Sequence, residues 1–253
     1  MKLIKASYEI LTPINGEEIL KQIELAARSC YQSEGKIEYD PIIPFDSNNK
    51  SGFIAVSARP LVTKLLKLGH EAMIEFGGMI TVRFIVDRGV SHELVRHRVA
   101  SFAQESTRYC NYGKDAHISF IIPSWCDIMD EATLTYVATS EKASGFDFYE
   151  DGIIMIRNLS FTDTEFDWLD AIATTESIYN TLLTKGWSPQ QARSVLPNSL
   201  KTEINVSANI REWRHIFKQR TAKAAHPQMR EVMCPLLDEF KTKIPILFDD
   251  INY

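Results

Sequence analysis

The sequence has few cysteines, few glycines and no long apolar run. Only 4 of its 253 residues are Cys and 11 are Gly, and no two cysteines form a CxxC pair. A chain of this length can bury a core without disulfides, so we expect free thiols. No stretch approaches the ~18 apolar residues of a membrane span, and the N-terminus has no apolar signal segment. We therefore expect a cytoplasmic protein with no membrane partner.

The sequence also lacks an excess of positive charge. Its formal net charge is -5, and its hydrophobic and charged fractions of 45% and 24% are ordinary for a globular protein. A general affinity for nucleic acid is therefore not expected. Any site for an anion must come from local clusters of Arg and Lys.

Hydrophobic periodicity predicts a mixture of helices and strands. Strands are expected over 2–11, 79–86, 117–122 and 200–207, and loops over 37–51 and 101–111. Helices are expected over 16–31, 61–69, 91–99, 161–185, 209–223 and 228–243, with a further helix start at Ser188-Pro189 and a helix and connection within 131–152. Because strands and helices do not alternate regularly, the fold class is predicted to be α+β.

One basic and polar stretch runs from Arg96 to Tyr109. It holds three arginines, one histidine and several hydroxyl or amide groups over fourteen residues. Clustered arginines repel one another, and burying them costs several kcal/mol per ion, so an anion should offset that cost. Guanidinium groups match phosphate oxygens bidentately. The alternative is a solvated arginine face with surface salt bridges, which the shortage of acidic partners makes less favourable.

A second basic cluster lies near the C-terminus. Its members are Arg211, Arg214, His215, Lys218, Arg220, Lys223 and His226. Taken alone, this cluster is interpreted as the solvent-exposed side of an amphipathic helix. The apolar side of that helix holds Ile210, Trp213, Ile216 and Phe217. Together with the first cluster, it makes a shared anion site worth considering.

Several other chemistries are rejected. The stretch from His92 to His97 fails the zinc-protease spacing because Arg96 stands where the second His is needed. The two histidines would lie about 140° apart around a helix, so no metal site is predicted. No GxSxG elbow surrounds Ser106, and no GxGxxG or Walker loop is present.

The triplet Arg96-His97-Arg98, followed after seven residues by Ser106, resembles the signature of flavin-dependent thymidylate synthases. Four further elements are similar to that family and extend the likeness over about residues 70 to 230. They are Thr107-Arg108-Tyr109, His70-Glu71 with Glu75, Arg193 before Leu196-Pro197, and Asn209-Ile210-Arg211 with Arg220 and His226.

This resemblance implies an enzyme, a methyltransferase that converts dUMP to dTMP. The one-carbon donor would be 5,10-methylenetetrahydrofolate, and the hydride would come from FADH2, reduced in turn by NADPH. The family fold implies one domain over residues 1–253, with a central, mostly antiparallel sheet and packed helices. Family members are usually homotetramers, so self-association is expected.

The resemblance also implies residue roles. Arg220 would be the catalytic residue, polarising the pyrimidine so that its N3 ionises. Ser106 is assigned to binding because the family chemistry needs no serine nucleophile. The expected dUMP-binding residues are Glu93, Arg96, Gln104, Glu105, Ser106, Thr107, Arg108, Arg193 and Arg220. The expected FAD-binding residues are His70, Glu75, Arg96, His97, Arg98, Gln104, Asn209, Arg211, His215 and His226.

The chain departs from the family pattern at a few positions. Many members have Asn-Glu where this chain has Ala103-Gln104, and Gln104 cannot act as a carboxylate. Glu93 stands where some members have Gln, and Ala72 replaces a hydroxyl residue. Two alternatives therefore stay open: a non-catalytic protein that binds dUMP or FAD, and a nucleic-acid-binding module, against which the acidic net charge argues.

Overall fold

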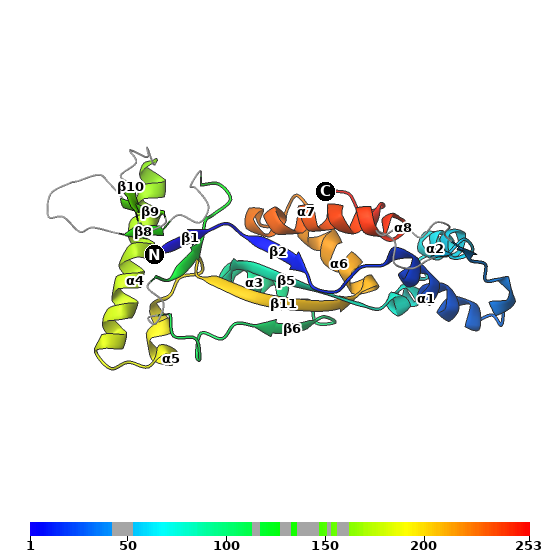
Figure 1. Cartoon of the computed structure of the whole chain (residues 1–253), viewed down its shortest axis with the longest axis horizontal. Coiled ribbons are helices and arrows are strands. Elements are labelled where there is room, and N and C mark those ends of the chain that lie inside the picture. The colour runs from blue at the N-terminus through cyan, green and yellow to red at the C-terminus, as the bar shows by residue number, and fades with distance from the viewer. Residues whose placement is uncertain (42–52, 113–116, 127–132, 136–146, 151–152, 156–161) are drawn as a thin grey trace. The chain divides into compact units, whose positions relative to one another are not determined.

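The computed structural model describes residues 1–41, 53–112, 117–126, 133–135, 147–150, 153–155 and 162–253 (Figure 1). The chain forms two compact units, each assembled from three segments. Unit 1 comprises Met1–Ser7, Phe84–Leu94 and Ala103–Ile204, and unit 2 comprises Tyr8–Arg83, Val95–Phe102 and Asn205–Tyr253. The expectation of one domain over residues 1–253 stays a prediction.

Unit 1 contains a five-stranded sheet with the strand order β10-β9-β8-β1-β7 (Figure 1). Strand β1 (Lys2–Ile4) pairs in parallel with β7 (Ser119–Ile121), and the other pairs are antiparallel. The remaining strands are β8 (Thr133–Thr135), β9 (Asp147–Glu150) and β10 (Ile153–Met155). The prediction of a helix within 131–152 is wrong for the residues that the structure describes there, which form β8 and β9. These segments are rich in threonine and aromatic residues, which favour an extended backbone.

A long helix, α4 (Asp163–Thr184), covers the hydrophobic core of unit 1. Its start is fixed by a capping box, in which Thr162 and Glu165 bond to each other's backbone N–H. Leu169, Ile172 and Tyr179 from this helix are buried with Leu3, Phe120 and other apolar residues of the unit. The helix predicted over 161–185 is confirmed, and two short helices follow it: α5 (Pro189–Ala192) and η3 (Arg193–Val195).

A four-stranded sheet has the order β2-β5-β11-β6. Its strands are β2 (Ser7–Ile10), β5 (Met79–Asp87), β11 (Lys201–Asn209) and β6 (Ser101–Gln104). The predicted alternation of β5 is confirmed, because Ile80, Val82, Phe84 and Val86 are all buried. The strand expected over 200–207 is also confirmed, and the one expected over 2–11 is split into β1 and β2.

Unit 2 is mainly helical. Its helices are α1 (Gly16–Ser29), α2 (Ala58–Lys67), η2 (Glu71–Gly77), α6 (Ile210–Arg220), α7 (Pro227–Lys243) and α8 (Pro245–Phe248), with the small elements η1 (Glu34–Lys36), β3 (Asp40–Pro41) and β4 (Phe53–Ile54). Helices α1, α2, α6 and α7 agree with the predicted ones within a few residues. Most of the loop expected over 37–51 lies outside the described residues, and its Asp40–Pro41 pairs with β4.

The core of unit 2 is aromatic. Trp213 and Phe217 from α6 meet Phe240 from α7 and Phe248 from α8, with ring centroids 5.1–5.8 Å apart. Trp213 is fully buried, and its Nε1–H donates to the carbonyl of Ile80 at 3.0 Å. This hydrogen bond satisfies the one polar atom of the indole, so α6 has a fixed position in the core.

The segment around the arginine triplet differs from prediction. The helix expected over 91–99 is α3 (Arg88–Leu94), whose start is capped by Asp87 Oδ1, which accepts from the N–H of Val90 at 2.7 Å. The next segment, expected as a loop, includes β6. Its polar residues did not predict a strand, but the segment pairs at the edge of the four-stranded sheet. Among the residues that the structure describes, no helix is long and apolar enough to cross a membrane.

Candidate active site

The triplet Arg96-His97-Arg98 lies in the turn after α3, in unit 2. The N–H of Ala100 donates to the carbonyl of His97 at 3.0 Å and closes this turn. Arg96 and Arg98 are exposed, whereas the His97 side chain is buried, with 4% of the residue exposed. The turn therefore presents two guanidinium groups to solvent and one imidazole to the interior.

His97 contacts three residues along one face of α6. The Nε–H of Arg220 donates to Nε2 of His97 at 2.9 Å, and Oε1 of Glu212 lies 3.6 Å from Nδ1. The ring of His215 meets that of His97 edge to face, with centroids 5.7 Å apart. Burial, helped by the charges of Arg220 and His215, lowers the pKa of His97 to about 4. The imidazole is therefore neutral at physiological pH.

His97, Glu212 and His215 also hold possible metal-ligand atoms, all within 4.8 Å of one another. Two imidazoles and a carboxylate suit a transition metal. However, the permanently charged guanidinium of Arg220 is hydrogen-bonded to the same imidazole, and its positive charge repels a divalent ion. The absence of a resident metal therefore stays our prediction.

The exposed side of α6 is rich in ion pairs. Arg211 Nη1 lies 2.6 Å from Glu75 Oε1, and Lys218 Nζ lies 3.6 Å from Glu71 Oε1. Arg211 and Glu75 were both expected to bind FAD, and here they pair with each other. Asn209, a third such residue, caps α6 by accepting from the N–H of Glu212 at 2.8 Å.

Arg214 is the buried cation of α6, with 2% of its side chain exposed. Its two Nη atoms donate to the two carboxylate oxygens of Asp250, each at 2.7 Å, and Nη1 also contacts the carbonyl of Leu247. This fork-to-fork pairing fixes the C-terminal segment to α6. Arg214 is therefore a structural residue, although it belongs to the second basic cluster of the sequence.

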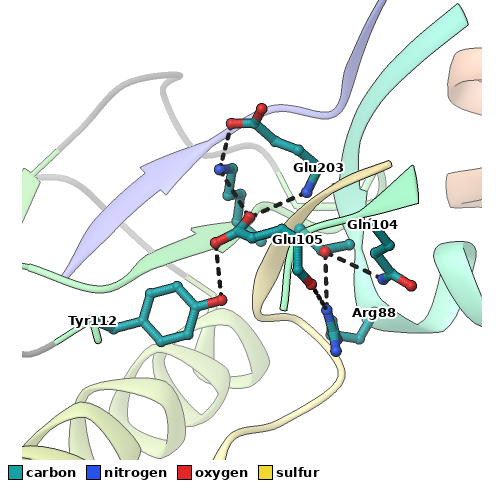
Figure 2. Close-up of polar contacts among 7 residues, drawn as sticks. Arg88, Gln104, Glu105, Tyr112 and Glu203 are labelled. Atoms are coloured by element: carbon teal, nitrogen blue, oxygen red, sulfur yellow. Dashed lines mark hydrogen bonds and ion pairs between the residues drawn. The ribbon is translucent and has the colours of Figure 1, made fainter. Parts of the chain in front are cut away.

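Unit 1 contains a separate polar network, in which Glu105 is the central residue (Figure 2). Its carboxylate accepts from the hydroxyl of Tyr112 at 2.9 Å, from Nζ of Lys201 at 3.2 Å and from the N–H of Glu203 at 3.3 Å. Its backbone N–H donates to the carbonyl of Glu203 at 2.9 Å. With three donors on its carboxylate, Glu105 is held as part of the framework of the predicted dUMP loop.

Gln104 and Arg88 share an acceptor in the same network (Figure 2). Nε2 of Gln104 lies 3.2 Å and Nη1 of Arg88 lies 2.9 Å from Oγ1 of Thr202. Gln104 also donates to Ser91 Oγ at 2.9 Å, and Arg88 donates to the carbonyl of Glu105 at 3.3 Å. A glutamate at position 104 could accept but could not donate, so this arrangement requires the amide.

A pocket of about 450 Å³ opens beside this network, entirely within unit 1. At its edge Nη1 of Arg193 donates to Oγ1 of Thr107 at 3.0 Å. Arg88 and Arg193 provide two fixed positive charges, and hydroxyl, amide and imidazole groups provide further hydrogen-bonding atoms. The lining residues are Arg88, His92, Thr107, Gln190, Arg193, Ser194, Leu196, Pro197, Asn198 and Leu200.

The predicted dUMP residues of unit 1 come from α3, β6 and the loop after it, and η3. Thr107 is buried, and Ser106 Oγ accepts from the N–H of Arg108 at 3.3 Å. Arg108 is exposed and lies over the ring of Tyr109, 5.2 Å from its centroid. Glu93 is half-buried on α3. The structure thus brings Thr107 and Arg193 together in one pocket.

The remaining predicted residues lie in unit 2. His70 is exposed between α2 and η2, and His226 is exposed at the N-cap of α7. His215 is exposed on α6, beside the buried His97. Of the predicted FAD residues in this unit, the structure joins Arg211 to Glu75 and places His97 against His215.

The sequence reasoning missed several residues of both clusters. Arg88 and His92 line the pocket, but His92 was considered only as a zinc ligand. The i, i+4 spacing of these two nitrogen-bearing side chains on α3 was the available signal. Glu212 beside His97 had no such signal, because the two residues meet only in the folded chain.

Comparisons with known proteins agree with this architecture. The family described as "Thymidylate synthase complementing protein" matches residues 15–246. A flavin-dependent thymidylate synthase of Corynebacterium aurimucosum is 29% identical over 231 residues, which cover 91% of this chain and 79% of the relative. A flavin-dependent thymidylate synthase of Corynebacterium glutamicum is 28% identical over 247 residues, covering 98% and 84%.

Among solved structures, the chain is similar to a UMP/dUMP methylase, PolB, from Streptomyces cacaoi bound with 5-Br dUMP. The TM-score is 0.66 at 20% identity, covering 98% of this chain and 96% of the other. At this identity the similarity shows a shared fold, and it confirms the predicted α+β class. Because the family match spans most of the sequence, the chain belongs to the thymidylate synthase complementing protein family.

Proposed function

We propose that this chain is a flavin-dependent thymidylate synthase, a methyltransferase that converts dUMP to dTMP. The carbon of 5,10-methylenetetrahydrofolate is transferred to C5 of the uracil ring and reduced to a methyl group, and the C5 hydrogen leaves as a proton. The proposal rests on the family match together with the names of the relatives.

The pocket of unit 1 is the observation that supports a nucleotide substrate most directly. It offers the guanidinium groups of Arg88 and Arg193 beside the hydroxyl of Thr107. A phosphate monoester carries nearly two negative charges near neutral pH and accepts several hydrogen bonds. Two arginines and a hydroxyl meet both needs, so we assign the phosphate of dUMP to this pocket.

The cations of unit 2 fit a flavin dinucleotide. Arg96, Arg98 and His215 are exposed and can donate to pyrophosphate or ring oxygens. Asn209 caps α6 with its amide oxygen, and no acceptor among the described residues binds its amide N–H groups, so these can donate to a ligand. His97 differs from the others, because its imidazole faces Arg220 and Glu212. FAD would supply the hydride that completes the methyl group.

Arg220 is assigned the catalytic role. Its guanidinium is permanently charged and half-buried at the end of α6. Negative charge develops on the pyrimidine when N3 ionises, and a fixed cation in a site of low dielectric stabilises that charge strongly. We therefore assign phosphate binding to the pocket of unit 1 and stabilisation of the developing charge to Arg220 of unit 2.

Three finer features belong to the same proposal. NADPH is assigned as the reductant, the assembly as a homotetramer and the location as the cytoplasm. Folate and dUMP are the small-molecule partners. The sequence resemblance supports these assignments, and each can be measured separately.

The decisive experiment is release of tritium from [5-³H]dUMP by the purified chain with FAD, NADPH and methylenetetrahydrofolate. We expect tritium release that requires the chain, FAD, NADPH and methylenetetrahydrofolate together. The protein should also be yellow and bind added FAD. A folded protein that binds FAD and dUMP but releases no tritium would be a non-catalytic nucleotide-binding protein. Equal turnover of [5-³H]UMP would assign the wider UMP/dUMP methylase activity.

A further inference from the structure

The imidazole of His97 is held between a cation and a carboxylate within unit 2. Nε2 accepts the Nε–H of Arg220 at 2.9 Å, and Nδ1 faces Oε1 of Glu212 at 3.6 Å. Only 4% of His97 and 8% of Glu212 are exposed. Both ring nitrogens therefore face protein groups. Flavin binding by His97 would not by itself explain why the ring is held between Arg220 and Glu212.

The hydrogen bond from Arg220 determines where the proton of His97 lies. A guanidinium donates only, so Nε2 must present its lone pair. A neutral imidazole has one N–H, which must then be on Nδ1, the atom that faces Glu212. This is the opposite of the tautomer that histidine prefers in water, so the folded chain selects the less common form.

Helix α6 provides both partners. Glu212 lies in its first turn, where the side-chain oxygen of Asn209 caps its N–H at 2.8 Å, and Arg220 is its last residue. The helix is anchored to the core by Trp213 and by the ion pair of Arg214 with Asp250. A buried imidazole placed between the two ends of an anchored helix can restrict the rotamers of a long arginine side chain.

We propose that Glu212 and His97 are positioning residues, which hold the guanidinium of Arg220 in one orientation for the reaction. This inference rests on the proposed function, because it assumes that Arg220 polarises the pyrimidine. The hydrogen bond from Arg220 requires the Nδ1–H tautomer of His97, and the nearby carboxylate of Glu212 favours the same tautomer by attracting that N–H. An arginine with a free side chain would spend part of its time away from the substrate, so turnover would fall.

The charges around His97 support a neutral, oriented ring. Arg220 and His215 face it from α6, together with the carboxylate of Glu212, and the exposed Arg96 and Arg98 flank it in the chain. The positive groups disfavour an imidazolium, which could no longer accept from Arg220. The same arrangement makes the contact insensitive to pH across the neutral range.

The first test is spectroscopic and needs no turnover. The full-length protein is labelled with ¹⁵N-histidine, and the signal of His97 among the 6 histidines is assigned by its loss in His97→Gln. We expect the Nδ1–H tautomer of His97, still neutral at pH 5, with and without FAD. An Nε2–H tautomer, or an imidazolium at pH 6, would overturn the proposal.

The second test compares side chains that keep or remove an acceptor. In His97→Gln the amide oxygen can accept from Arg220, whereas His97→Leu has no acceptor. Loss of a charge-assisted hydrogen bond predicts a roughly 10- to 100-fold lower kcat for His97→Leu, with a smaller change in KM for dUMP. His97→Gln should recover most of that loss, and Glu212→Gln should likewise exceed Glu212→Leu.

All rates are measured at saturating FAD, with bound flavin determined for each variant. Glu239→Gln is the matched control, because this glutamate lies on α7 and pairs at the surface with Lys243. Equal losses in the Gln and Leu variants would show that His97 acts only through packing or flavin binding. An inactive wild-type chain that retains the Nδ1–H tautomer would refute the proposed function while leaving the local geometry intact.

Discussion

Arg193 and Thr107, which lie 86 residues apart in the sequence, are joined by a hydrogen bond of 3.0 Å from Nη1 to Oγ1. Thr107 is buried, so it offers the arginine a fixed acceptor. Arg193 is thereby directed along the pocket in which Arg88 supplies a second positive charge. The pair explains how one exposed arginine can be oriented before an anion arrives, which lowers the entropy cost of binding.

Arg193→Ala should weaken dUMP binding by roughly 10- to 100-fold, because it removes one charge-assisted contact to phosphate. Arg193→Lys should recover part of this loss, since it restores the charge but not the fork. Calorimetry with dUMP measures both effects. Arg83→Gln, which removes a surface arginine paired with Glu9, is the control. Unchanged affinity in Arg193→Ala would place the phosphate elsewhere.

Arg220→Ala should remove turnover while leaving the fold intact. A lost electrostatic contact to developing charge typically lowers kcat by about 100- to 1,000-fold. The measurement is tritium release from [5-³H]dUMP, with circular dichroism and size-exclusion chromatography to check the folded assembly. Near-normal turnover would show that another group activates the pyrimidine.

Tyr112 should make stability depend on alkaline pH. Burial, together with Glu105, raises the pKa of Tyr112 above its ordinary value of 10.0. The folded state therefore favours the neutral phenol, and its contribution is complete below pH 10 and is lost as the pH rises above 10. Tyr112→Phe should lose about 1 kcal/mol at pH 7 and show a shallower decline in urea-unfolding free energy between pH 9 and 11.5. Parallel declines in both proteins would contradict this role.

His97 should make the free energy of unfolding fall as the pH becomes mildly acidic, whereas Tyr112 should make it fall at alkaline pH. Its pKa is lowered to about 4 by burial and by Arg220 and His215, whereas the unfolded chain has the ordinary value of 6.5. The unfolded state binds the proton more readily, so stability is complete above pH 6.5 and falls as the pH decreases toward 4. The full effect is at most about 3 kcal/mol. His97→Gln should reduce the slope of unfolding free energy over this range.

Asp250→Asn should destabilise the fold by about 1–3 kcal/mol, because the buried guanidinium of Arg214 loses the carboxylate at 2.7 Å and keeps the more distant one of Glu71, which lies 3.8 Å from Nη2. Arg214 also lowers the pKa of Asp250 by hydrogen bonding, so the pair should persist until the pH falls below 3.8. Urea unfolding at neutral pH measures the loss. The neighbouring Asp249→Asn is the matched control, since Asp249 is exposed like Asp250 but is not one of the acceptors that bind Arg214. Equal stability of the two variants would contradict a structural ion pair.

Elements with strong local patterns could be predicted from the sequence. Strand β5 alternates between buried and outward residues, and α4 begins with its own capping box, so both follow from neighbouring residues alone. Strand β6 could not be predicted in this way, because its polar residues become a strand only through pairing at the edge of a sheet. The end of α3 at Leu94 was missed for a related reason: the polar, charged residues after it do not distinguish a helix from a turn.

The candidate site likewise contains some residues that could be predicted from the sequence and others that could not. Family resemblance named Thr107 and Arg193, and the structure joins them. Glu212 has no distinguishing sequence pattern, and both Arg88 and Glu212 acquire their partners only by long-range folding. The roles assigned to His70 and His226 stay predictions, because both side chains are exposed.

The division of the chain into interleaved segments has a practical consequence for protein engineering. Strands β5 and β11 each begin in one compact unit and end in the other. A cut at either of these unit boundaries, after Arg83 or after Ile204, therefore divides a strand. Each fragment would carry only part of a strand, so we expect co-expressed fragments divided at these points to restore less activity than fragments divided in a loop.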